Sequence, residues 1–238
     1  MLSTTIRSRG AATAVSATSG HPDTRTAAME IAHALHDHGG ARCSLVLLFV
    51  SYHHAAAFGE AVETIRSAVH PAHLLACTAE SVLGDDQELD GMAGMSALAI
   101  TVPGMRIEPF SGRPGQPLPL SRPDALPDHL GVQNDTKALL MLADPFSTPI
   151  TRLLPALNTL RIDERPVPLL GGMASGASQP GHNRLAVDDQ LQLRMLCIYP
   201  SILFLWPRRF ATTSPAAMKV SSFLEAMCVA CHLWKARI

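Results

Sequence analysis

The chain carries one pattern twice: an apolar strand, a polar turn, an amphipathic helix, and a second apolar strand that ends in small residues. The strand segments are 45–54 and 74–81 in the first copy, and 138–146 and 168–175 in the second. Between the first two segments, the apolar residues recur at helical spacing. A pattern repeated in this way predicts a duplicated strand–helix–strand unit, and therefore a fold in which helices pack on sheets.

We predict an α/β (α+β mixed) fold in which two strand–helix–strand repeats, each continuing into a hairpin, pool their strands in mixed sheets covered by helices. The first hairpin is expected over 96–110, with its turn at Pro103-Gly104. The predicted parts are a disordered leader (1–25), repeat one (about 26–110), a Pro- and Gly-rich linker (111–131), repeat two (132–189) and a divergent tail (190–238). The tail is set apart because no second hairpin is recognisable after Asp189.

The composition argues against several classes of partner. A hydrophobic fraction of 47% in 238 residues suffices for a large core, whereas a net charge of −1 and 5% aromatic residues argue against nucleic acid. The longest apolar run, 195–206, is too short to span a membrane as a helix, so no membrane partner is expected. Five scattered cysteines and no secretory signal favour a cytoplasmic protein. A weak transit-like N-terminus leaves import into an organelle as a minor alternative.

No cofactor and no metal are expected. The phosphate-loop and dinucleotide fingerprints do not occur in the sequence. The histidines are numerous, but their spacing is not that of a closed metal site. Cys228 and Cys231 form a CxxC string before His232, yet no second CxxC accompanies it.

Polar and small residues follow the strands of both repeats, at the position where open α/β sheets gather their ligands. We predict a ligand pocket between the repeats. Its candidate residues are Ser51, His53, His54, Asp144 and Phe146 after the first strands, and Cys77, Thr78, Ala79, Glu80, Gly171, Gly172 and Ser175 at the ends of the second strands. Main-chain N–H groups of the second set could hold a carboxylate or phosphate. The alternative is structural: helix caps in the first set, and tight turns or close strand packing at the glycines.

A catalytic alternative is a thiol hydrolase. It would use Cys77 as the nucleophile and His53 or His54 as the base. Glu80 or Asp144 would then orient the histidine. A cysteine on a buried strand is more often an inert apolar side chain, so we expect no catalytic residue and no enzymatic activity.

Three segments carry a family resemblance: 47–54 (Leu-Leu-Phe-Val-Ser-Tyr-His-His), 75–84 (Leu-Ala-Cys-Thr-Ala-Glu-Ser-Val-Leu-Gly) and 170–176 (Leu-Gly-Gly-Met-Ala-Ser-Gly). Together they resemble the N-terminal half of the FIST domain, a sensory module of bacterial signalling proteins that also occurs in a eukaryotic F-box protein. The most specific piece is the turn from Cys77 to Glu80, because family members carry a similar small-residue turn after the same strand and helix. The resemblance covers about 26–189.

The resemblance implies ligand sensing rather than catalysis, with small molecules such as amino acids or small carboxylates as ligands. The module would act in intracellular signal transduction. The F-box relative implies an alternative, a protein-interaction platform with a partner in a signalling or ubiquitin-ligase context.

Overall fold

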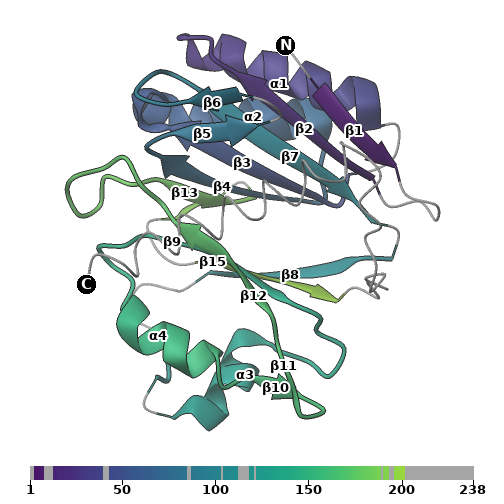
Figure 1. Cartoon of the computed structure of the whole chain (residues 1–238), viewed down its shortest axis with the longest axis vertical. Helices are drawn as coiled ribbons and strands as arrows, with labels where there is room; N and C mark the ends of the chain where they lie inside the picture. The colour runs from purple at the N-terminus through teal and green to yellow at the C-terminus, as the bar shows by residue number, and fades with distance from the viewer. Residues whose placement is uncertain are drawn as a thin grey trace.

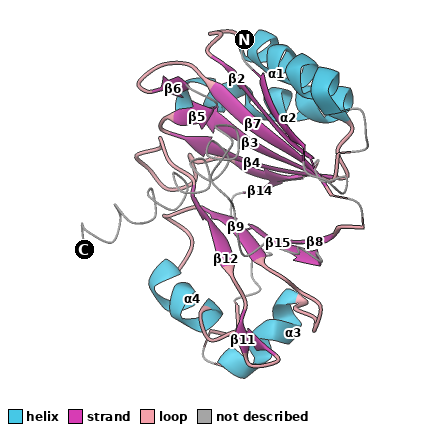
Figure 2. Ribbon diagram, turned by 45° about the vertical axis from the view of Figure 1, so that its right-hand side comes forward, coloured by secondary structure: helices cyan, strands magenta, loops and turns pink. Residues whose placement is uncertain are grey.

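The computed structural model describes residues 3–7, 13–39, 43–84, 87–102, 104–111, 118–120, 122–188, 190–192 and 196–201. These residues form four layers: two helices, a larger sheet, a smaller sheet, and two further helices (Figure 1). Figure 2 shows the two sheets facing each other, with the helices on their outer sides. The fold is therefore mixed α/β, as predicted.

The helices form the two outer layers. They are α1 (Thr24–Gly39) and α2 (Phe58–Val69) on the larger sheet, and α3 (Leu126–Leu130) and α4 (Ile150–Leu157) on the smaller one, with short 3-10 turns η1 (Tyr52–Ala57) and η2 (Pro123–Ala125). None of the described helices is long and apolar enough to cross a membrane.

The larger sheet has seven strands among the described residues, in the order β1-β2-β7-β3-β4-β13-β14. Their bounds are β1 Ser3–Arg7, β2 Thr13–Ser19, β3 Leu45–Ser51, β4 His73–Ala79, β7 Met95–Thr101, β13 Leu185–Val187 and β14 Gln190–Gln192. Strand β3 lies in the middle, and its nearly continuous apolar run suits a position buried on both faces.

The smaller sheet has four described strands, in the order β12-β9-β15-β8. Their bounds are β8 Arg106–Ser111, β9 Leu139–Ala143, β12 Leu169–Met173 and β15 Leu196–Ser201. Two short antiparallel pairs complete the fold, β5 (Val82–Gly84) with β6 (Gln87–Leu89) and β10 (Arg161–Ile162) with β11 (Arg165–Pro166).

Each sheet contains one parallel pair joined through a helix. The larger sheet has β3–α2–β4, and the smaller has β9–α4–β12. The two units therefore build two mixed sheets and exchange strands between them, in agreement with the predicted pooling of strands in mixed sheets. Strand β8 leaves the first unit for the smaller sheet, while β13 leaves the second unit for the larger one.

Three hydrophobic clusters separate the layers. One lies between the larger sheet and α1 and α2, with Ile31, Leu48 and Ile65 fully buried. A second lies between the smaller sheet and α3 and α4. The third lies between the sheets, where Leu75 and other side chains of the larger sheet meet those of the smaller sheet.

The predicted disordered leader is wrong for residues 13–25. All seven residues of β2 pair with β7, and its inward-facing Val15 and Ala17 are buried under α1. Asp23 then caps α1, because its carboxylate accepts hydrogen bonds from the backbone N–H and hydroxyl of Thr26 at 2.8 and 2.7 Å.

The predicted hairpin over 96–110 is also wrong. Strand β7 lies in the larger sheet and β8 in the smaller, so the chain passes from one sheet to the other between Thr101 and Arg106. The backbone N–H of Met105 donates to the carbonyl oxygen of Val102 at 3.1 Å, so a turn is present in this segment. A local turn signal does not determine which strand pairs with which.

The boundaries of the linker and the tail need correction as well. The predicted linker contains α3, whose Leu126 and Leu130 are buried in the second cluster. The predicted tail begins with β14 and β15, which pair with β13 and with β8 and β9. The remainder of the tail, 202–238, lies outside the described residues.

Candidate functional site at the carboxyl ends of the parallel strands

The carboxyl ends of the two parallel pairs meet. The backbone N–H of Ser175, after β12, donates to the carbonyl oxygen of Thr78 in β4 at 3.1 Å. The hydroxyl of Ser175 in turn accepts from the backbone N–H of Glu80 at 2.9 Å. The strand ends from which the sequence predicted a pocket are therefore neighbours, although they belong to different sheets.

A buried polar bridge ties the same ends together. Asp144, directly after β9, is 2% exposed, and Asn183, just before β13, is 1% exposed. The amide of Asn183 donates to one Asp144 carboxylate oxygen at 2.9 Å. The other oxygen accepts from the N–H and hydroxyl of Ser147 at 3.0 and 2.7 Å. We call the group Thr78, Glu80, Asp144, Ser175 and Asn183 the strand-end junction.

Several main-chain N–H groups of the junction already have partners within the protein. Besides those of Ser175 and Glu80, the N–H of Thr78 donates to the carbonyl of Arg184 at 2.9 Å, and that of Ala174 donates to Ala143 at 2.7 Å. The Thr78 hydroxyl accepts from the Arg184 N–H at 3.1 Å. These groups bind one another, so the predicted use of these N–H groups for a ligand's charged end has no support here.

The glycines of β12 have different roles. Gly171 has φ +134°, and a Cβ at this position would overlap the carbonyl oxygen of Met141 on the paired strand, so only glycine permits this approach. At Gly172, a Cβ would meet no atom within 4 Å. Gly171 is thus a packing residue, whereas the space beside Gly172 is open among the described residues.

Gly176, directly after Ser175 of the strand-end junction, was not among the site residues predicted from the sequence. It has φ +91°, and a Cβ there would lie 2.6 Å from Cβ of Tyr52 and 3.0 Å from the carbonyl oxygen of Ala79. The loop after β12 therefore packs directly on η1 and on the end of β4. Asn183 was missed too, because nothing local distinguishes it from an ordinary turn residue.

The residues after β3 point in different directions. Ser51 is turned toward β7, where its hydroxyl accepts from the N–H of Gly94 at 2.9 Å. His54 is 2% exposed and lies against α1, with its Nδ1 2.8 Å from the hydroxyl of Thr24. His53 is exposed. Of the predicted histidines, His54 therefore contacts the helical layer and His53 faces solvent.

Cys77 lies in the cluster between the sheets and is 3% exposed. Burial raises the pKa of its thiol to about 12, so the thiol stays protonated at neutral pH. Its environment is thus that of an inert apolar side chain.

The exposed candidates are His53, Glu80 and Phe146, which we call the rim residues; Phe146 is 44% exposed. They follow β3, β4 and β9, respectively. Ala79, next to Glu80, is half-buried and pairs with Ser51. The predicted residues thus divide into a buried, hydrogen-bonded set and an exposed set at strand ends.

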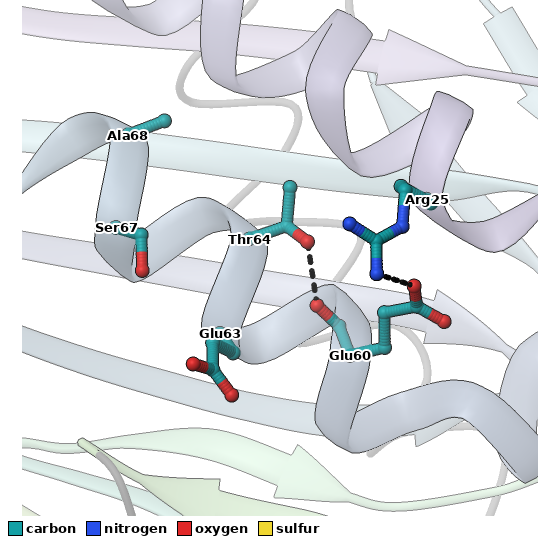
Figure 3. Close-up of a pocket in the computed structure, with 6 residues that line it drawn as sticks. All are labelled: Arg25, Glu60, Glu63, Thr64, Ser67 and Ala68. Atoms are coloured by element: carbon teal, nitrogen blue, oxygen red, sulfur yellow. Dashed lines mark hydrogen bonds and ion pairs between the residues drawn. The ribbon is translucent and has the colours of Figure 1, made fainter.

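A surface hollow of about 710 Å³ lies elsewhere, along the outer side of α2 (Figure 3). It is lined by Arg25, Glu60, Glu63, Thr64, Ser67 and Ala68. Arg25 and Glu60 form an exposed ion pair at 2.6 Å across it. No candidate from the sequence lines this hollow. Among the described residues, no three His, Cys, Asp or Glu side chains are grouped to hold a metal ion.

A family model, the FIST N domain, matches residues 44–197. The match covers both parallel units, the strand-end junction and the crossing between the sheets. This chain belongs to the FIST family. A search among curated proteins found no match. The FIST match begins at 44 rather than at about 26, and it extends past 189 into β15, so the family pattern lies further toward the C-terminus than the sequence resemblance indicated.

Proposed function

We propose that this chain is a non-catalytic sensory module of signal transduction, and that it binds a small amino-acid-like molecule or carboxylate beside the strand-end junction. Membership of the FIST family is consistent with a sensory or signalling role. The observation that carries the proposal is the meeting of β4 and β12 at the Thr78–Ser175 hydrogen bond. This contact brings two sets of carboxyl ends together, the position at which open α/β sheets bind ligands.

The division of the candidates supports binding over catalysis. The side chains of Thr78, Asp144 and Asn183 are buried and hydrogen-bonded to protein atoms, so they fix the geometry. The exposed rim residues are left to contact a ligand: Glu80 offers a carboxylate for an ammonium group, and Phe146 offers an aromatic face. The burial of Cys77 and the raised pKa of its thiol argue against its use as the nucleophile of the hydrolase alternative.

The binding test is a thermal melt of the full chain with a panel of amino acids and small carboxylates. A compound at one hundred times its dissociation constant should stabilise the fold by about 2.7 kcal/mol. Glu80→Gln and Phe146→Ala should reduce that stabilisation, whereas Glu88→Gln, an exposed change on β6, should leave it intact. A panel without any stabilising compound, or equal responses in all variants, would contradict the proposal.

A protein-interaction platform is the second candidate. Phe146 and Leu170 belong to the same unit, and they are 44% and 41% exposed. Aromatic side chains such as that of Phe146 are enriched in protein–protein interfaces. If the chain is a protein-interaction platform, Phe146→Ala and Leu170→Ser should abolish binding of a protein partner. The unchanged chain should then show no increase in melting temperature with any small molecule of the panel.

A further inference from the structure

His54 is held in an unusual position in η1. Its ring is 2% exposed, and its Nδ1 lies 2.8 Å from the hydroxyl of Thr24, in the first turn of α1. Its Nε2 is fully buried and has no hydrogen-bond partner among the described residues. Because a protonated imidazole has two N–H donors, the charged ring would be buried with one donor lacking an acceptor.

The turn that holds His54 connects two parts of the molecule. η1 runs directly from the end of β3 to the start of α2. At its beginning, Tyr52 packs against Gly176, which follows the strand-end junction. Two residues later, His54 contacts Thr24 of α1. A change at His54 would therefore move the turn that contacts the junction on one side and the helical layer on the other.

The charges around His54 are few and of mixed sign. His53 in η1 and His21 before α1 both oppose a positive charge on the ring, and Asp23 favours it. Asp23 is exposed and already accepts two hydrogen bonds from Thr26.

Several charged groups on the neighbouring helices have partners of their own. Arg25 of α1 pairs with Glu60 of α2, and Glu30 of α1 accepts from Ser19 at 2.6 Å. Burial outweighs the favourable charge of Asp23 and lowers the pKa of His54 below its usual 6.5.

We propose that His54 is a proton-sensitive latch that holds η1 against α1 at neutral pH and releases it on acidification. The inference concerns regulation and does not depend on the identity of any ligand. A neutral His54 contributes stability that is fully present above pH 6.5, its ordinary value. That contribution is lost as the pH falls from there through the lowered pKa of the folded state, because the unfolded chain binds the proton first.

Thermal melts of the full chain at pH 7.5 and pH 5.5 test the latch. The unchanged chain should melt at a lower temperature at pH 5.5. His54→Asn keeps a polar atom for Thr24 but cannot be protonated, so its drop should be smaller by about 3 °C. His36→Asn changes an exposed histidine of α1 that is not among the charges acting on His54, and it is the matched control, which should keep the full drop. Equal drops in the unchanged chain and in His54→Asn would overturn the proposal.

Two measurements on the unchanged chain keep the test valid if His54→Asn does not fold. In an NMR titration, the ring assigned to His54 should titrate below pH 6.5, and titration of this ring at or above 6.5 would overturn the proposal. Hydrogen exchange, corrected for the intrinsic effect of pH, should show the amides of 52–57 losing protection at pH 5.5. Unchanged protection of these amides would show that protonation does not release the turn.

Discussion

The side-chain amide of Asn183 donates a hydrogen bond to the carboxylate of Asp144 and so joins the segment entering β13 of the larger sheet to the end of β9 in the smaller one. Both side chains are almost completely buried. The contact spans 39 residues of sequence, and it fixes how the two sheets meet at the junction.

Removing the amide from this bridge should destabilise the fold. Asn183→Ala leaves one oxygen of the buried Asp144 without its partner, which costs about 1–3 kcal/mol because the group remains desolvated. Urea unfolding of the variant and the unchanged chain measures the difference. The control is Asn134→Ala, an exposed asparagine, which should change stability by less than about 0.5 kcal/mol. Equal effects of the two substitutions would contradict a structural role for the bridge.

Gly176 and Gly181 separate backbone strain from a steric clash. Both have positive φ, +91° and +78°, but only a Cβ at Gly176 would meet Tyr52 and Ala79. Gly181→Ala should cost about 1–2 kcal/mol from the backbone alone. Gly176→Ala should cost clearly more, because Tyr52 must also move. If chemical denaturation gives the same loss for both variants, then the close packing of η1 on this loop is not maintained in solution.

Cys77 should resist alkylation in the folded chain. Its raised pKa and its burial both keep the reactive thiolate from forming at neutral pH. Iodoacetamide labelling followed by mass spectrometry should show modification of Cys77 only as fast as the chain opens, and full modification in denaturant. Rapid labelling of the native protein at pH 7 that is lost in Cys77→Ala would instead support the hydrolase alternative.

Asp188 should stabilise the start of β4 and its contact with α2. Its carboxylate accepts from Arg66 of α2 and from the N–H of Leu74, both at 3.0 Å, and lies 3.3 Å from Nδ1 of His73. Asp188→Asn preserves a side chain that tolerates the left-handed backbone, φ +54°, but removes the charge.

Asp188→Asn should lower the free energy of unfolding by about 1 kcal/mol, since the ion pair of Asp188 with Arg66 is partly exposed. This decrease should become smaller in high salt. Asp163→Asn, an exposed aspartate with φ +48°, is the control and should be nearly neutral in the same salt series. A loss for Asp188→Asn that does not depend on salt would show that the hydrogen bonds, and not the charge, provide this stabilisation.

The two parallel units could be predicted from sequence because each of their strands contains a run of apolar residues. Strand β2 could not, since Thr13–Ser19 consists of small and hydroxyl residues that become buried only under α1. Helix α3 was hidden in a proline-rich stretch, where only Leu126 and Leu130 mark its buried face. Periodicity detects large apolar side chains, and these elements carry few of them.

The candidate site was predictable in position but not in detail. Strand ends are visible in the sequence, so Thr78, Asp144 and Ser175 were identified, and the structure brings them together. Which of these residues bind each other depends on how the two sheets stack, and that is set by contacts between residues far apart in the chain. For this reason Asn183 was not predicted as the partner of Asp144. His54 was predicted to line the pocket, whereas its ring contacts Thr24 of α1.

The exchange of β8 and β13 between the units makes the two halves of the chain interdependent. A chain divided between β8 and α3 would give one fragment whose larger sheet lacks β13, and another whose smaller sheet lacks β8. Each fragment would expose a strand edge that only the other can pair. The two fragments should therefore be insoluble when expressed alone and should reassemble when expressed together. Loss of either half would therefore leave the other half without a strand that completes its sheet.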